Sequence, residues 1–99
     1  MEVNIQYQKM EVSESLNEIL MKKLDKLGWK YSWVINANVL FKMENDKTGQ
    51  DKVCEIELSA PGPRLFAKSR TDNFEKAMVE TIGELKRQLE KRQAIFVRH

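Results

Sequence analysis

The sequence predicts an α+β domain whose elements follow in the order β-α-β-β-β-α. Two stretches, residues 16–27 and 74–89, repeat apolar residues at helical spacing, and four shorter stretches alternate apolar with polar residues as half-buried strands do. A chain of 99 residues with 41% hydrophobic content has room for one hydrophobic core. We therefore expect one domain over residues 1–99, a two-layer fold in which two parallel helices cover one face of a four-stranded sheet.

The first strand and the first helix are predicted near the amino terminus. Residues 2–8 (EVNIQYQ) alternate polar with apolar side chains, which is typical of a strand with one buried face. Ser13 or Ser15 can cap the helix that follows, and Gly28 stands where we expect that helix to end. The residues that recur at helical spacing between them are Leu16, Ile19, Leu20, Leu24 and Leu27.

Three strands and the turns between them fill the middle of the chain. Residues 35–43 alternate over the longest stretch, and the turn-forming residues 44–51 separate them from a further alternating run at 54–60. The Pro-Gly-Pro sequence at 61–63 predicts a tight reversal of the chain. Residues 64–70 (RLFAKSR) then form a short fourth strand, whose length suits the edge of a sheet.

The last helix is predicted from Thr71 or Asp72, either of which can cap it, to about Arg92. Its apolar stripe consists of Phe74, Met78, Thr81, Ile82, Leu85 and Leu89. Because a strand-helix-strand unit normally makes its two strands parallel, and two hairpins follow, both helices are expected to run in the same direction. Their carboxyl ends are then expected at one end of the domain, beside Arg64.

The formal net charge of +2 conceals an uneven distribution of charge along the chain. Residues 22–30 hold four lysines and one aspartate, and residues 86–99 hold five basic residues and one glutamate. Residues 64–70 hold three basic residues and no acid, whereas residues 44–57 hold five acids and two lysines. Three basic clusters and one acidic cluster therefore predict a polarised surface.

The basic clusters are candidates for phosphate binding, because lysine and arginine side chains release counterions when they neutralise phosphates. The candidate RNA-binding residues are Lys22, Lys23, Lys26, Lys30, Arg64, Lys86, Arg87, Lys91 and Arg92. The alternative interpretation is an ordinary solvated helix face, since cations are also stabilised at helix carboxyl ends by the macrodipole. Residues 64–70 favour binding, because a strand offers no such dipole.

Three aromatic residues follow the first predicted helix, in the sequence GWKYSW at 28–33. A junction between a helix and a strand needs apolar side chains to close the core, so we expect Tyr31 and Trp33 to pack there. Trp29 is then the aromatic residue expected to be exposed. An exposed Trp29 could stack on an unpaired base while Lys30 contacts a phosphate.

Several function classes are disfavoured by features that the sequence lacks. No apolar run approaches the roughly 18 residues that cross a bilayer, and residues 1–20 do not resemble a signal peptide, so we expect a cytoplasmic protein without a membrane partner. Cys54 and His99 are too few to hold a metal, and no glycine-rich phosphate loop is found, so neither a cofactor nor a small-molecule substrate is expected. An enzyme that uses Glu55, Glu57 or Cys54 is the least favoured hypothesis.

Several segments, in order along nearly the whole chain, resemble the ribosome hibernation promoting factor family, also called ribosome-associated translation inhibitors. They are VNIQ at 3–6, the helix at 13–27, the second and third strands, LFAKS at 65–69 and the helix at 72–93. The resemblance implies a fold similar to double-stranded RNA binding modules. It also implies a non-enzymatic factor that binds the small ribosomal subunit and its rRNA. Such a factor blocks the mRNA and tRNA channel during dormancy or stress. The resemblance allows a second hibernation factor as a partner.

In that family the contacts come from basic residues of both helices, and the resemblance carries them to Lys22, Lys23, Lys26, Lys86, Arg87 and Lys91, with Arg92 as an addition. The chain departs from the family pattern at Ser32, Trp33 and Val79, where a carboxylate, a basic residue and an acid are common. It resembles the short members, which lack the carboxyl-terminal domain that drives ribosome pairing. The alternative hypothesis is a protein-interaction module that uses a sheet edge or the IFV tail at 95–97.

Overall fold

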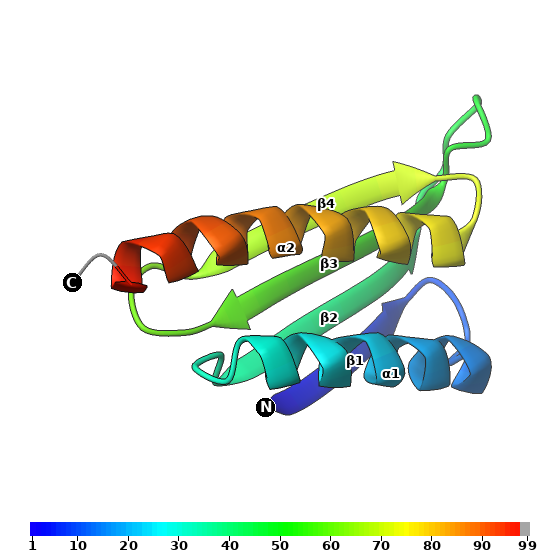
Figure 1. Ribbon diagram of the computed structural model, residues 1–99. Helices are drawn as coiled ribbons and strands as arrows, with labels where there is room; N and C mark the ends of the chain where they lie inside the picture. The colour runs from blue at the N-terminus through cyan, green and yellow to red at the C-terminus, as the bar shows by residue number, and fades with distance from the viewer. Residues whose placement is uncertain (98–99) are drawn as a thin grey trace.

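Residues 1–97 are described by a computed structural model, and they form strands and helices in the predicted order (Figure 1). The elements are β1 (Glu2–Gln8), α1 (Glu14–Lys30), β2 (Asn36–Met43), β3 (Lys52–Ser59), β4 (Leu65–Thr71) and α2 (Phe74–Val97). The predicted α+β fold class is therefore confirmed, and each strand begins and ends within about two residues of its predicted bounds, the precision expected of such boundaries.

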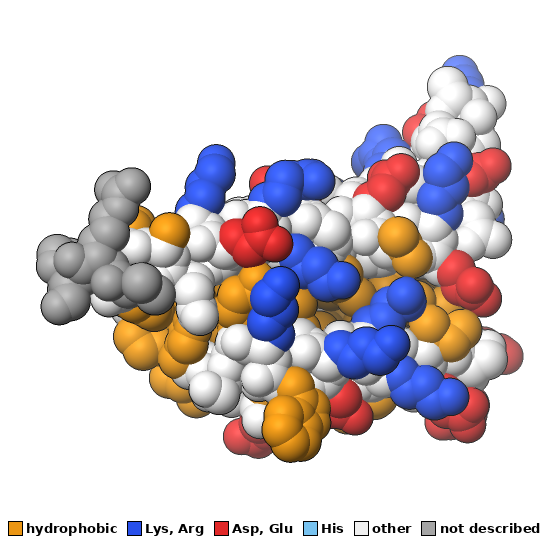
Figure 2. Space-filling model, in the orientation of Figure 1, with side chains coloured by type: hydrophobic (Ala, Val, Ile, Leu, Met, Phe, Trp, Pro, Cys, Tyr) orange, Lys and Arg blue, Asp and Glu red, His pale blue; other side chains and the backbone are white. Residues whose placement is uncertain are grey.

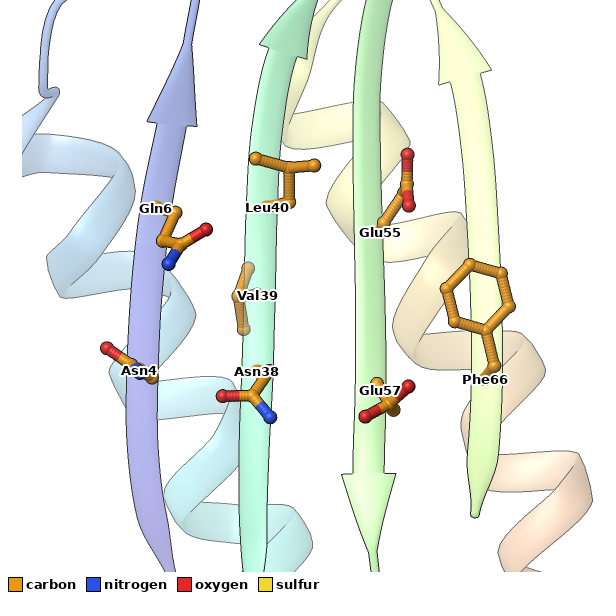
Figure 3. Close-up of a pocket in the computed structure, with 8 residues that line it drawn as sticks. All are labelled: Asn4, Gln6, Asn38, Val39, Leu40, Glu55, Glu57 and Phe66. Atoms are coloured by element: carbon orange, nitrogen blue, oxygen red, sulfur yellow. The ribbon is translucent and has the colours of Figure 1, made fainter.

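The four strands form one sheet in the order β1-β2-β3-β4. β1 is parallel to β2, and the other two neighbouring pairs are antiparallel. The register aligns Ile5, Val39, Ile56 and Ala67 in one row across the sheet, and all four side chains pack in or against the core. Because side chains alternate along a strand, the neighbouring rows point to the opposite face, which no helix covers (Figures 1 and 3).

Both helices lie on the same face of the sheet and run in the same direction, as predicted (Figure 1). α1 lies over β1 and β2, and α2 lies over β3 and β4, an arrangement that is also visible behind the strands in Figure 3. The parallel pairing of β1 with β2 requires the chain to cross the sheet between them, and α1 is that crossover. The helices therefore lie side by side, each with one flank towards the other.

α1 begins at one of the two predicted caps but ends later than predicted. Of the two candidate serines, Ser13 is the N-cap, because its Oγ accepts a hydrogen bond from the backbone N–H of Leu16 at 3.3 Å. The prediction that Gly28 ends α1 is wrong, because the helix continues to a cap at Tyr31. A Cβ atom at position 28 would lie 3.0 Å from Cε of Met1, so the glycine permits close packing instead.

The start of α2 also differs from the prediction. Neither Thr71 nor Asp72 caps the helix; instead Oδ1 of Asn73 accepts a hydrogen bond from the backbone N–H of Lys76 at 3.1 Å. The Thr71 side chain has a different partner, because its Oγ1 accepts a hydrogen bond from the N–H of Asn73 at 3.1 Å. At the other end, α2 continues for a further turn beyond Arg92.

The core between the sheet and the helices is apolar and includes Cys54. Its largest fully buried side chains include Phe41, Leu20, Leu24, Leu27, Ile56, Leu58, Met78, Leu85 and Leu89. Cys54 is fully buried, and burial raises the pKa of its thiol to about 12. A thiol in this environment fills space and is a poor nucleophile.

Candidate nucleic-acid interface

A groove with lysines on both rims lies between the two helices, on the face of the molecule shown in Figure 2. Its middle part is lined by Lys23, Lys26, Val79, Ile82, Gly83 and Lys86. Its continuation towards the carboxyl end of α1 is lined by Lys26, Leu27, Lys30, Tyr31 and Lys86. We call these residues together the interhelical groove.

Helical spacing brings the basic residues to the rims of this groove. Lys23, Lys26 and Lys30 lie along one flank of α1, beside the leucines that enter the core. Such lysine stems can cover apolar surface while their ammonium groups remain in water. On α2, Val79 and Gly83 lie one turn apart and leave space for the groove, a role that the sequence interpretation missed although their spacing puts them on one face with Lys86.

Most of the lysines in this region lack an acidic partner. Within residues 1–97, no ion pair is formed by Lys22, Lys23, Lys26, Lys30, Lys86 or Lys91. Arg87 differs, because its Nη2 lies 2.6 Å from Oε2 of Glu84. The hydrogen bond from Arg87 holds the pKa of Glu84 below its usual value. The lysines therefore form a positive surface that neighbouring carboxylates do not neutralise.

The basic residues of 64–70 do not join this surface. Arg64 Nη1 lies 2.8 Å from Oε1 of Glu57, and Lys68 Nζ lies 3.7 Å from Oε2 of Glu55. Both glutamates belong to the face of the sheet opposite the helices (Figure 3). Arg64 lies beside the carboxyl-terminal part of α2, as expected, because Arg92 of that helix contacts the backbone of the preceding Pro63. Its side chain nevertheless pairs with Glu57, because the antiparallel pairing of β3 with β4 places acids of one strand beside bases of the other.

Arg92 is occupied by a structural contact. Its Nη1 donates hydrogen bonds to the backbone oxygens of Pro63 at 2.6 Å and of Pro61 at 3.3 Å. Between those prolines Gly62 adopts a φ of +94°, in the region that favours glycine. The Arg92 side chain therefore holds the turn between β3 and β4, and its donors are not directed into the interhelical groove.

The remaining candidate residues lie along the helices and not at one pole of the domain. Lys22 and Lys23 are near the middle of α1, and Lys86 and Arg87 are near the middle of α2. The carboxyl ends of both helices lie at one end of the domain, as predicted (Figure 1). The basic residues of α2 do not gather at that end, because α2 is longer than expected and its last turn holds no basic residue. The positive surface instead extends along the facing flanks of the two helices (Figure 2).

The three aromatic residues at and after the carboxyl end of α1 are placed as the sequence predicts. Trp29 is 89% exposed, whereas Tyr31 is buried. Trp33 is partly buried, and its Nε1 donates a hydrogen bond to Oε1 of Gln93 at 2.6 Å. Its ring also packs edge-on against Phe96, with 5.0 Å between the ring centroids. Of these three aromatic residues, Trp29 is therefore the one whose side chain is available to a ligand.

The uncovered face of the sheet has a different electrostatic character. A shallow depression there is lined by Asn4, Gln6, Asn38, Val39, Leu40, Glu55, Glu57 and Phe66 (Figure 3). Lys42 Nζ lies 3.0 Å from Glu44 and 3.1 Å from Glu55, and these hydrogen bonds raise the pKa of Lys42. Glu55 and Glu57 are therefore both ion-paired with basic side chains on this face.

The carboxyl-terminal tail is only partly described. Phe96 packs on Trp33 and Ile95 is exposed, whereas the side chain of Val97 lies outside the described residues, as do Arg98 and His99. No helix within residues 1–97 is both long enough and apolar enough to cross a membrane. In the same part of the chain, no group of three or more His, Cys, Asp or Glu residues is placed to hold a metal ion.

The chain is similar to known proteins over most of its length. Residues 3–94 match the family described as sigma 54 modulation protein / S30EA ribosomal protein. Two sequences from Pseudomonas putida, each named ribosome hibernation promoting factor, are 31% identical to it over 91 residues, which cover 92% of this chain and 85% of the relative.

Two solved structures share the fold. A ribosomal subunit interface protein from Coxiella burnetii has a TM-score of 0.84 at 22% identity, covering 95% of this chain and 99% of that one. The N-terminal domain of Protein Y from Thermus thermophilus has a TM-score of 0.78 at 18% identity, covering 92% of this chain and 98% of that one. At these identities the likeness shows that the arrangement of two helices on a four-stranded sheet is common to all three.

Proposed function

The chain belongs to the sigma 54 modulation protein / S30EA ribosomal protein family, and from this premise we propose that it is a ribosome hibernation factor that binds the small ribosomal subunit. It binds rRNA through the lysines of the interhelical groove and sterically excludes mRNA and tRNA from their channel. It acts by occupying a site in the cytoplasm, without catalysis, when translation is to be stopped during dormancy or stress.

The observation that carries this proposal is the unneutralised positive charge on facing flanks of two rigid helices. Lys23 and Lys26 stand on one rim of the groove and Lys86 on the other. A phosphate backbone that follows the groove neutralises both rims at once, and each phosphate releases counterions as it binds. Lysines on two helices have a fixed spacing, and they contact folded RNA best where its phosphates have a matching spacing. The shape of the RNA therefore contributes to recognition.

Trp29 adds a contact of another kind at the carboxyl end of α1. Its indole is 89% exposed and lies on the same helix as Lys22 and Lys26. An exposed aromatic ring beside cations stacks on an unpaired base while the cations contact the neighbouring phosphates. The contact tolerates different bases, because every base offers a π-face.

Sedimentation of the protein with ribosomes and with isolated subunits tests the proposal. The wild-type protein is expected to travel with the small subunit and with whole ribosomes, to be displaced by mRNA and tRNA, and to dissociate as salt rises. The double variant Lys26→Glu/Lys86→Glu is expected to bind at least about tenfold more weakly, since it reverses one charge on each rim.

The matched control is Lys47→Glu/Lys76→Glu, which makes the same change in formal charge outside the groove. Lys47 lies in the exposed turn between β2 and β3, and Lys76 lies in the first turn of α2. This control is expected to bind like the wild-type protein. Equal losses of affinity in both double variants would show that the effect comes from net charge, and would overturn the assignment to the groove. Failure of the wild-type protein to comigrate with ribosomes at any salt concentration would overturn the ribosome proposal itself.

A further inference from the structure

One tyrosine in the interhelical groove has a buried hydroxyl group without a partner. Tyr31 is 2% exposed, and within the described residues its hydroxyl oxygen makes no hydrogen bond. Buried polar groups in proteins almost always have a partner, so an exception requires an explanation. Tyr7 shows the usual situation in this chain, because its hydroxyl lies 2.8 Å from Oδ1 of Asn17 and 3.0 Å from the carbonyl oxygen of Ser13.

The surroundings of Tyr31 indicate which partner is missing. Tyr31 lines a pocket of about 150 Å³ at one end of the groove, together with Lys26, Leu27, Lys30 and Lys86. The ammonium group of Lys30 lies 5.5 Å from the centroid of the Tyr31 ring. Among the described residues, the charged groups that line the pocket are all lysines, which only donate hydrogen bonds, and none is a carboxylate. The side-chain polar groups of the residues that line this pocket are therefore ammonium and hydroxyl groups, which are hydrogen-bond donors.

We propose that this pocket binds a single phosphate group of the bound RNA, with the Tyr31 hydroxyl donating a hydrogen bond to one phosphate oxygen and Lys26, Lys30 and Lys86 neutralising its charge. The RNA as the source of the phosphate rests on the proposed function; the pocket itself requires only an anion with several acceptor oxygens. The Lys30 side chain over the ring is flexible and moves aside to admit the phosphate. Tyr31 then selects for a phosphate that reaches the bottom of the groove. Lysines at the rim do not make this selection.

Tyr31→Phe removes the hydroxyl and keeps the ring in the core. Because the lost group has no partner within residues 1–97, the melting temperature of the variant is expected to be unchanged or higher. Its affinity for the small subunit is expected to fall about tenfold, the loss of one hydrogen bond to a charged acceptor. The slope of log affinity against log salt is expected to stay the same, because tyrosine is neutral and releases no counterion.

Two further variants control this measurement. Tyr7→Phe removes a hydroxyl that has partners and lies outside the groove, so it is expected to lower the melting temperature and leave affinity unchanged. Lys86→Gln removes a charge from the same pocket, so it is expected to lower affinity and also to reduce the salt slope by about one. Wild-type affinity in Tyr31→Phe would overturn the assignment.

Inorganic phosphate tests the pocket without any RNA. In a ¹⁵N-labelled protein at constant ionic strength, added phosphate is expected to shift the backbone amide signals of residues 30–33 and 86, and the shifts are expected to be weaker in Tyr31→Phe. Identical shifts in the two proteins would overturn the proposal. If phosphate shifts the signals in a Tyr31-dependent way while the protein does not bind ribosomes, the proposed function is wrong and the phosphate pocket is supported. If ribosome binding depends on Lys26 but not on Tyr31, the proposed function is supported and the role of Tyr31 in binding a phosphate is wrong.

Discussion

Lys26 of α1 and Lys86 of α2 line the same two hollows between the helices, one from each side of the interhelical groove. Neither forms an ion pair within residues 1–97, and no acidic residue lines either hollow. Two cations held near each other without a counter-charge repel, and an anion between them relieves the repulsion. The free protein therefore keeps a small electrostatic cost that binding of a polyanion removes.

This repulsion predicts a salt-dependent stability. Lys86→Gln is expected to raise the free energy of unfolding by about 0.2–0.5 kcal/mol at low salt, the size of a like-charge contact on a helix surface. The gain is expected to vanish near 1 M salt, where charges are screened over about 3 Å. Urea unfolding at both salt concentrations checks it, with Lys47→Gln as a control in an exposed turn. A gain of equal size in the control would assign the effect to net charge.

Arg92 is expected to matter for stability and not for RNA binding. Arg92→Ala removes the hydrogen bonds to the backbone oxygens of Pro61 and Pro63, which is expected to cost about 0.5–1.5 kcal/mol. Its affinity for the small subunit is expected to change little. Arg64→Ala is the companion variant, because the exposed ion pair with Glu57 contributes at most about 1 kcal/mol. Urea unfolding measures the stability of both variants, and sedimentation with the small subunit measures their affinity. A large loss of affinity in either variant would indicate that the substituted residue contacts RNA.

Trp29 is expected to report binding by its fluorescence. Its indole is in water in the free protein, so stacking on a base is expected to quench its emission, whereas Trp33, which is hydrogen-bonded to Gln93, is expected to change little. Trp29→Ala is expected to weaken binding by about 1–3 kcal/mol while the melting temperature stays the same. Titration of single-tryptophan variants with small subunits separates the two signals. Emission from Trp29 that stays constant through saturation would contradict stacking.

Cys54 is expected to be unreactive and to make stability depend on pH in alkaline solution. Burial raises the pKa of the Cys54 thiol from 9.0 to about 12 in the folded state, so the folded chain keeps a proton that the unfolded chain loses above pH 9. The stability contribution is complete below pH 9 and is lost as pH rises towards 12. Thiol labelling at pH 8 is expected only after unfolding, and the decline in stability from pH 9 to 11 is expected to be shallower in Cys54→Ala. Rapid labelling of the native protein would contradict the burial.

Much of the fold could be predicted from local patterns. Alternating residues at 2–8 and 35–43 marked strands, and leucines at helical spacing marked α1, because burial on one face imposes these periods on the sequence. Helix ends were less predictable. Thr71, Asp72 and Asn73 are all good capping residues, and only the position of the backbone after β4 decides that Asn73 is the one used.

The candidate site was predicted in part. The sequence placed lysines on the flanks of two helices and indicated that those helices run in parallel, which was enough to bring Lys26 and Lys86 towards each other. It also suggested that Arg64 belongs with them, because no acid stands near it in the chain. Glu57 is seven positions away in sequence and 2.8 Å away in space, since β3 and β4 pair.

By itself, the sequence determined which elements form, which residues enter the core, and that Trp29 is exposed while Tyr31 and Trp33 pack. These properties follow from the period of apolar residues, which is local. Only the tertiary structure decided which charges are neutralised and that Arg92 holds a turn. It also decided that Tyr31 lines a pocket with lysines while its buried hydroxyl has no partner within the described residues. Charge pairing and hydrogen bonding act between residues that are near in space, and the register of the strands and the spacing of the helices decide which residues those are.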